Sequence, residues 1–185
     1  MKFLVLFSLA ITFVTGECSS QLVYMCKSGE VTFFSEAPLE NIEAHNFSPN
    51  SFLNTSTREI AFLIPISNFK FRKELMREHF NEKYMESDKF PMATFNGKIN
   101  EPLDFSVAGV YPVTVNGKLT IHGIVHEVIE SGTFTVNEKN IDLKSEMRIA
   151  TADYHISIPH LLFQNIADTI RVNIKTTYVP YQKKP

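Results

Sequence analysis

Six histidines and one acidic–histidine pair are the residues of this sequence whose types and spacing could do chemistry. His122 and His126 are four residues apart, a spacing that on a helix would present two metal ligands on one face. On a strand the same spacing separates two side chains by about 13 Å, at roughly 3.3 Å per residue, which is too far for one ion. Gly123 turns the chain between them, so the true distance depends on that turn. His155 and His160 have no recognisable third ligand nearby, and we expect neither a metal site nor a cofactor.

Glu78 and His79, beside Arg77, are residue types that acid–base catalysis uses. The solvated face of a helix explains the same three residues without any chemistry. No G-x-S-x-G, H-E-x-x-H, P-loop or G-x-G-x-x-G motif occurs in the chain. These residues therefore give no convergent acid–base pair that would indicate an enzyme.

The composition indicates one globular domain rich in strands. The 185 residues are 44% apolar and include 16 Phe and no Trp. This length suits a single domain with a real core, and the aromatic content favours strands. A formal net charge of -2 offers no basic field for nucleic acid, so we expect no nucleic-acid partner.

The N-terminus has the pattern of a secretory signal peptide. A basic start, about a dozen apolar residues and a small-residue exit occupy residues 1–16. We expect cleavage before Glu17, a mature domain over 17–185 that is periplasmic or secreted, and no transmembrane segment after removal of the signal. Export makes a disulfide between Cys18 and Cys26 feasible, although two unrelated thiols fit the sequence equally well.

Alternation of apolar and polar residues with a period of two is the clearest pattern in the rest of the chain. It predicts strands that each have one apolar face, as in an antiparallel sheet or barrel. The apolar faces comprise Ile60, Phe62, Ile64 and Ile66; Ala93, Phe95, Gly97 and Ile99; Ile141, Leu143, Met147 and Ile149; and Ile170, Val172, Ile174 and Tyr178. Weaker strands are expected around 31–35, 42–47, 52–55 and 124–136.

Two segments need a choice between alternatives. Asn116-Gly117 is a strong hairpin signal, but a hairpin there would mix apolar and polar side chains on each face. One continuous strand over 111–121 keeps them apart, with Gly117 as a bend or a close backbone approach. From Phe71 to Tyr84 the apolar residues recur at helical spacing, which predicts an amphipathic helix of roughly four turns. A second short helical turn is expected after Pro159.

These elements predict an all-β fold: a closed antiparallel barrel of about eight strands with one amphipathic helix. A barrel of this size is just wide enough to be filled by its own side chains or to hold one slender ligand. The apolar faces point inward. The alternation does not separate a fully packed core from a cavity, but on general physical grounds we expect the packed core slightly more. The residues that we expect to line the pore or cap one end of it are Phe33, Phe62, Ile64, Met76, Phe80, Tyr84, Phe95, Val113, Leu119, Ile121, Met147 and Ile174.

Two blocks of sequence resemble a known family. Arg77-Glu78-His79-Phe80 followed by Tyr84 to Phe95 is similar to the helix-to-strand signature of the YceI-like family, and Gly117-Lys118-Leu119-Thr120-Ile121-His122-Gly123 is similar to its "G-x-L-T-I-H-G" strand. The resemblance implies a lipocalin-like barrel, exported to the periplasm or beyond, that holds a long isoprenoid chain in its pore. It also implies that no catalytic residues are expected.

We rank three functions on these grounds. A carrier or sequestering protein for a long-chain isoprenoid-type lipid, polyprenyl or quinone-like, comes first. A ligand-free envelope or stress-related interaction module that uses the outer face of the barrel comes second, and an enzyme a distant third. Whether the chain forms a homodimer is left open.

Overall fold

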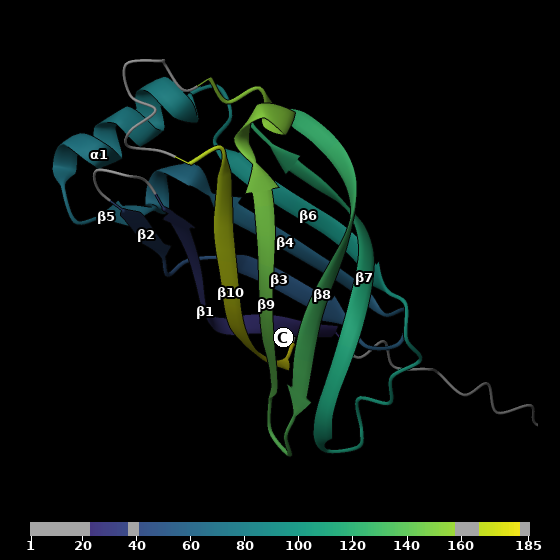
Figure 1. Cartoon of the computed structure of the whole chain (residues 1–185). Helices are drawn as coiled ribbons and strands as arrows, with labels where there is room; N and C mark the ends of the chain where they lie inside the picture. Colours follow the sequence, from purple (N-terminus) through teal and green to yellow (C-terminus); the bar gives the residue numbers. More distant parts are fainter. Residues whose placement is uncertain (1–22, 37–40, 158–166, 182–185) are drawn as a thin grey trace, which may run out of the picture.

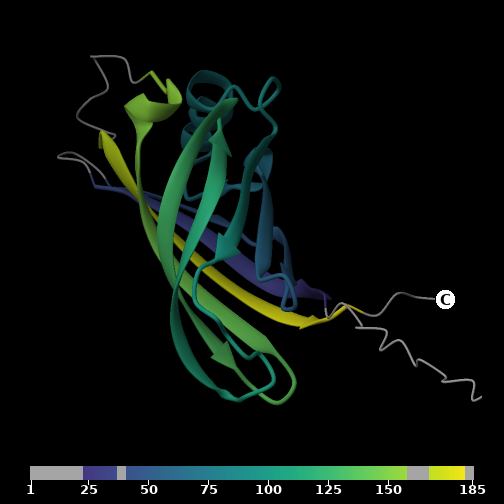
Figure 2. The same ribbon diagram turned by 90° about the vertical axis from the view of Figure 1, so that its right-hand side faces the viewer.

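A computed structural model describes residues 23–36, 41–157 and 167–181 of the chain. Eight of its strands form a closed antiparallel barrel, in which the last strand pairs with the first (Figure 1). Figure 2 shows these two strands lying side by side along their length. The barrel strands are β1 (Val23–Ser35), β3 (Asn50–Asn54), β4 (Glu59–Pro65), β6 (Met92–Ile99), β7 (Gly109–Ile121), β8 (Ile124–Val136), β9 (Ile141–Ala150) and β10 (Thr169–Pro180). The predicted eight-stranded barrel is therefore confirmed.

Strand β1 is long enough to pair with three other strands. Its outer edge pairs with β10 from Tyr24 to Phe34. Its other edge pairs first with β3, over residues 23–25, and then with β2 (Ile42–Asn46), over residues 31–35. Strand β2 carries the two-residue strand β5 (Lys70–Phe71). The β2–β5 pair therefore extends the sheet beside the barrel without joining its closed wall.

The predicted alternation holds along the barrel strands, because buried side chains alternate with more exposed ones. One end of the barrel is packed solid, where β8 turns into β9 and where β3, β6 and β10 end. Its centre is a group of side chains that are at most 1% exposed: Leu53, Ile99, Phe134, Ile141 and Tyr178. This end supplies the apolar core that stabilises the closed wall.

The chain crosses Gly117 as one continuous strand, as predicted. Gly117 pairs with Gly97 of β6, and the ring of Phe95 packs over the pair: a Cβ added to Gly117 would lie 2.6 Å from two ring carbons. The hairpin comes five residues later, at His122 and Gly123, whose φ angles are 51° and 75°. Two successive residues with positive φ are typical of the tight turn that suits the twist of a β-hairpin.

The helix is shorter than the helical spacing of apolar residues predicted, and its predicted length was wrong. It consists of α1 (Glu74–His79) and a π-helical turn, η2 (Phe80–Tyr84). Phe71 is not part of it, because its backbone pairs with Ala44 of β2. Leu75 is 60% exposed rather than buried. The local spacing of apolar residues is helical from Phe71 onward. Because Phe71 pairs with β2 as part of a strand, the helix begins only at Glu74.

An aromatic cluster joins this helix to the second end of the barrel. The rings of Phe33, Phe69, Phe71 and Phe80 contact one another, with centroids 5.0–5.6 Å apart. Aromatic pairs at this separation contribute about 0.5–1.5 kcal/mol each beyond their burial. The cluster closes the end of the barrel that lies opposite the packed core.

Several predictions fall on residues that are not described. The signal peptide over 1–16, Cys18 and the helical turn after Pro159 all lie outside the described residues. Cys26 lies half-buried in β1, and its pairing with Cys18 stays one of the two alternatives that the sequence leaves open. Within the part of the chain that the structure describes, no helix is long and apolar enough to cross a bilayer.

Candidate ligand-binding cavity

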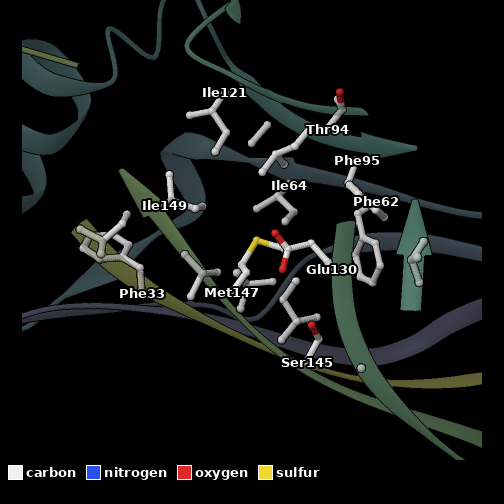
Figure 3. A pocket seen from close by; sticks show the side chains of 18 of the residues that line it. Phe33, Phe62, Ile64, Thr94, Phe95, Ile121, Glu130, Ser145, Met147 and Ile149 are labelled. Carbon is white, nitrogen blue, oxygen red and sulfur yellow. The ribbon is translucent and has the colours of Figure 1, made fainter. Parts of the chain in front are cut away.

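A cavity of about 120 Å³ lies inside the barrel between the packed core and the aromatic cluster. Side chains from β1, β4, β6, β7, β8, β9 and β10 line it, and almost all of them are apolar (Figure 3). From the sequence we expected a fully packed core slightly more than a cavity. The structure is packed at one end of the barrel and hollow toward the other. An apolar cavity of roughly 150 Å³ is large enough to bind a benzene-sized ligand. The observed volume therefore accepts about one five-carbon isoprene unit.

Most of the predicted pore residues lie around this cavity. Ten of the twelve line it: Phe33, Phe62, Ile64, Phe80, Phe95, Val113, Leu119, Ile121, Met147 and Ile174. Met76 and Tyr84 lie on the helix segment outside the lining. Contact of any of the twelve with a lipid stays a prediction.

One polar group in the lining was not predicted from the sequence. Glu130 of β8 points into the cavity toward Met147 and Ile64, and Ser145 of β9 lies close to it (Figure 3). A signal was available, because Glu130 has the same parity as the inward-facing Val128 and Phe134. It was obscured by Val125 and Ile129 on the opposite face of the strand, which are 55% and 72% exposed.

The carboxyl group of Glu130 has no compensating partner in the described residues. None of them donates a hydrogen bond to it or pairs with it as a cation, and no Lys, Arg or His lines the cavity. Burial raises the pKa of Glu130 above its ordinary value, because a low-dielectric surrounding disfavours the charged form. Burial, the charge of Asp153 and the charge of Glu130 together raise the pKa of the Tyr154 hydroxyl.

The barrel wall is interrupted next to Glu130. Strands β8 and β9 pair only from Val136–Ile141 to Gly132–Ser145, and they separate beyond that point (Figure 1). The hydroxyl of Ser145 donates to the carbonyl oxygen of Ser131 at 2.7 Å and marks the last contact. Beyond it, residues 124–131 of β8 and 146–150 of β9 form no ladder with each other. We call this the β8–β9 interruption.

Two histidines close the far end of the interruption. His126 Nε2 lies 2.9 Å from the carbonyl oxygen of Asp153, and His122 Nδ1 lies 3.1 Å from that of Tyr154. Both oxygens belong to η3 (Thr151–Tyr154), the short helix that follows β9. His122 Nε2 also contacts a carboxylate oxygen of Glu86 at 3.1 Å. The two histidines therefore fasten η3 to the β7–β8 hairpin.

The other residues considered for chemistry lie away from the cavity. Glu78 is exposed on α1, and Arg77 forms an ion pair with Glu74 on the same helix. Within residues 23–36, 41–157 and 167–181, no three His, Cys, Asp or Glu side chains lie close enough to hold a metal ion. The arrangement is that of an apolar container with one acidic group in its wall.

Known proteins resemble this chain both in sequence pattern and in fold. The pattern of the YceI-like domain matches residues 9–178 of the chain. The chain is similar in structure to a polyisoprenoid-binding domain from Saccharophagus degradans, with a TM-score of 0.74 and 15% identity over 87% of this chain and 100% of that one. It is also similar to BcnA from Burkholderia cenocepacia (TM-score 0.66, 16% identity, 80% and 95% covered) and to the YceI protein of Campylobacter jejuni (TM-score 0.56, 15% identity, 99% and 100% covered). The comparison with curated proteins returned no match.

Proposed function

The chain belongs to the YceI-like domain family, and we propose that it is a binding protein, not an enzyme, that sequesters or carries a long-chain isoprenoid-type lipid in its barrel. The observation that carries the proposal is the almost wholly apolar cavity inside the barrel. The similar domain from Saccharophagus degradans is a polyisoprenoid-binding domain. This supports a polyprenyl or quinone-like ligand here.

Hydrophobic transfer supplies the binding energy in this proposal. Each CH₂ group removed from water contributes about 0.8 kcal/mol, so one isoprene unit contributes roughly 4 kcal/mol. Ordering the chain and displacing side chains oppose this gain. Because the cavity of about 120 Å³ holds about one unit, a longer chain requires the barrel to widen. At the β8–β9 interruption no ladder hydrogen bonds have to break. The wall can therefore widen there at a lower free-energy cost than elsewhere.

Export forms a second part of the proposal. The pattern of residues 1–16 supports a cleaved signal peptide and a periplasmic or secreted protein. The intact mass of the chain purified from its own host tests this directly. We expect a mature chain that begins at Glu17, and a full-length chain that retains Met1 would refute export by this route.

Lipid binding is tested by native mass spectrometry of the purified chain after incubation with undecaprenol or a ubiquinone. We expect a bound species that extracts into organic solvent. Ala93→Phe adds a ring inside the cavity and should abolish this species, because the added ring is comparable in size to the cavity itself. Asn96→Phe adds the same ring on the exposed face of the same strand and serves as the matched control.

Circular dichroism must show that both variants keep the fold, since overpacking costs about 1–3 kcal/mol. An unliganded mass for the unmodified chain with every lipid would refute the proposal. It would favour the interaction module instead, because the outer face of the barrel exposes Phe52 and Ile129, at 43% and 72%, beside a shallow groove.

A further inference from the structure

Glu130 is the one acidic side chain among the residues that line the cavity. A structural carboxylate in an apolar interior is normally paired with a cation or accepts several hydrogen bonds. Glu130 is half-buried, and none of the described residues provides either. The group therefore has unused capacity for hydrogen bonding, and that capacity faces the space in which a ligand would lie (Figure 3).

The position of Glu130 gives a ligand access to it. It precedes Ser131, whose carbonyl oxygen receives the last cross-strand contact from Ser145. Glu130 therefore stands at the point where β8 and β9 part, between the closed half of the wall and the β8–β9 interruption. A polar group on a ligand could reach this carboxyl while the attached hydrocarbon chain packs on Ile64 and Met147 inside the cavity.

The chemistry of the carboxyl group restricts which polar group fits. An ionised carboxylate only accepts hydrogen bonds, and a protonated one still accepts through its carbonyl oxygen. A ligand with N–H or O–H donors is therefore suited to both forms. An anionic head group, such as a phosphate or a carboxylate, would meet a like charge, and the lining contains no Lys or Arg to offset the repulsion.

We propose that Glu130 binds the donor-bearing polar end of a lipid, a long-chain primary amine or alcohol, and that it makes the cavity reject lipids with an anionic end. The inference rests on the proposed lipid-binding function and specifies the class of ligand. It favours a polyprenol over a polyprenyl phosphate.

The test compares three probes of equal chain length: dodecylamine, dodecanol and dodecanoate. Isothermal titration calorimetry at neutral pH should show the amine binding most tightly and dodecanoate most weakly. Glu130→Gln keeps the shape and removes the charge, so it should lower the amine-to-dodecanoate affinity ratio about tenfold or more. Glu130→Leu should lower it further and should also weaken dodecanol relative to the unmodified chain.

Glu127→Gln is the matched control. Glu127 lies on the same strand, faces outward with its side chain 84% exposed, and pairs with Lys118 at 3.9 Å. This variant should leave all three affinities unchanged. Equal binding of amine and dodecanoate by the unmodified chain, or an unchanged ratio in both Glu130 variants, would overturn the inference.

Undecaprenol separates this inference from the proposed function. If undecaprenol binds and the short probes show no preference, the role of Glu130 is wrong while lipid binding stands. If neither undecaprenol nor any probe binds, both proposals fail. Circular dichroism of the Glu130 variants checks that a lost preference does not come from a lost fold.

Discussion

A buried hydrogen-bonded chain across β1 offers a sharp test of how the barrel is closed. The Ser51 hydroxyl lies 2.8 Å from the carbonyl oxygen of Ala61 and 2.6 Å from the Tyr178 hydroxyl. Because the carbonyl can only accept, Ser51 donates to it, and Tyr178 therefore donates to Ser51. Both residues are at most 2% exposed, and they belong to β3 and β10, the two strands that flank β1.

The two single variants should differ in cost. Tyr178→Phe removes one hydrogen bond and leaves Ser51 still donating to Ala61, so it should lower the free energy of unfolding by about 1 kcal/mol. Ser51→Ala removes both hydrogen bonds and leaves the buried Tyr178 hydroxyl dependent on the side chain of Thr176, which should cost about 2 kcal/mol. The double variant has no hydroxyl at position 178. It should therefore cost less than the two single variants summed, by about 1 kcal/mol or more.

Urea unfolding followed by circular dichroism measures these values, provided that the slope with denaturant is the same in all four proteins. Val172→Ala is a useful reference. Val172 is an apolar β10 residue, 8% exposed, whose truncation should add independently to Ser51→Ala. If Ser51→Ala costs no more than Tyr178→Phe, or if their effects are strictly additive, the hydrogen-bonded chain does not exist as described.

Three further predictions follow from single positions. Gly117→Ala should destabilise the chain by about 1–3 kcal/mol in urea unfolding, because its Cβ would lie 2.6 Å from an aromatic ring of the neighbouring strand; a neutral effect would contradict the close approach. Glu130→Leu should raise stability at pH 7. Burial raises the pKa of Glu130 in the fold, so the carboxyl lowers stability above that folded-state pKa and not below its unfolded value, and the gain should shrink toward pH 4. Glu86→Gln should flatten the acid side of the stability curve, because Lys89 and then His122 hold the pKa of Glu86 below its ordinary value. That stabilisation is present above the unfolded pKa and is lost as the pH falls through the folded one; unchanged acid sensitivity in thermal unfolding would refute this contact.

Local patterns in the amino-acid sequence were enough to predict most of the strands and the class of fold. Alternation is a local property of each segment, and one buried face per strand is enough to predict an antiparallel barrel. The same reasoning correctly kept β7 continuous through Gly117, because a hairpin there would have mixed the two faces. It failed at Phe71, where local helical spacing competed with a backbone pairing to Ala44 of β2 that no local pattern shows.

The site, in contrast, depends on contacts between strands that are far apart in the chain. Strand β8 has apolar residues on both faces, so its period could not assign Glu130 to the interior. The turn at His122 and Gly123 fixes the register of β8 on β7, and a shift of one residue would reverse every side chain. The cavity is likewise a difference between the volume that the wall encloses and the volume of side chains from seven strands. It depends on packing between residues far apart in the chain, and for this reason local alternation could not distinguish a filled barrel from a hollow one.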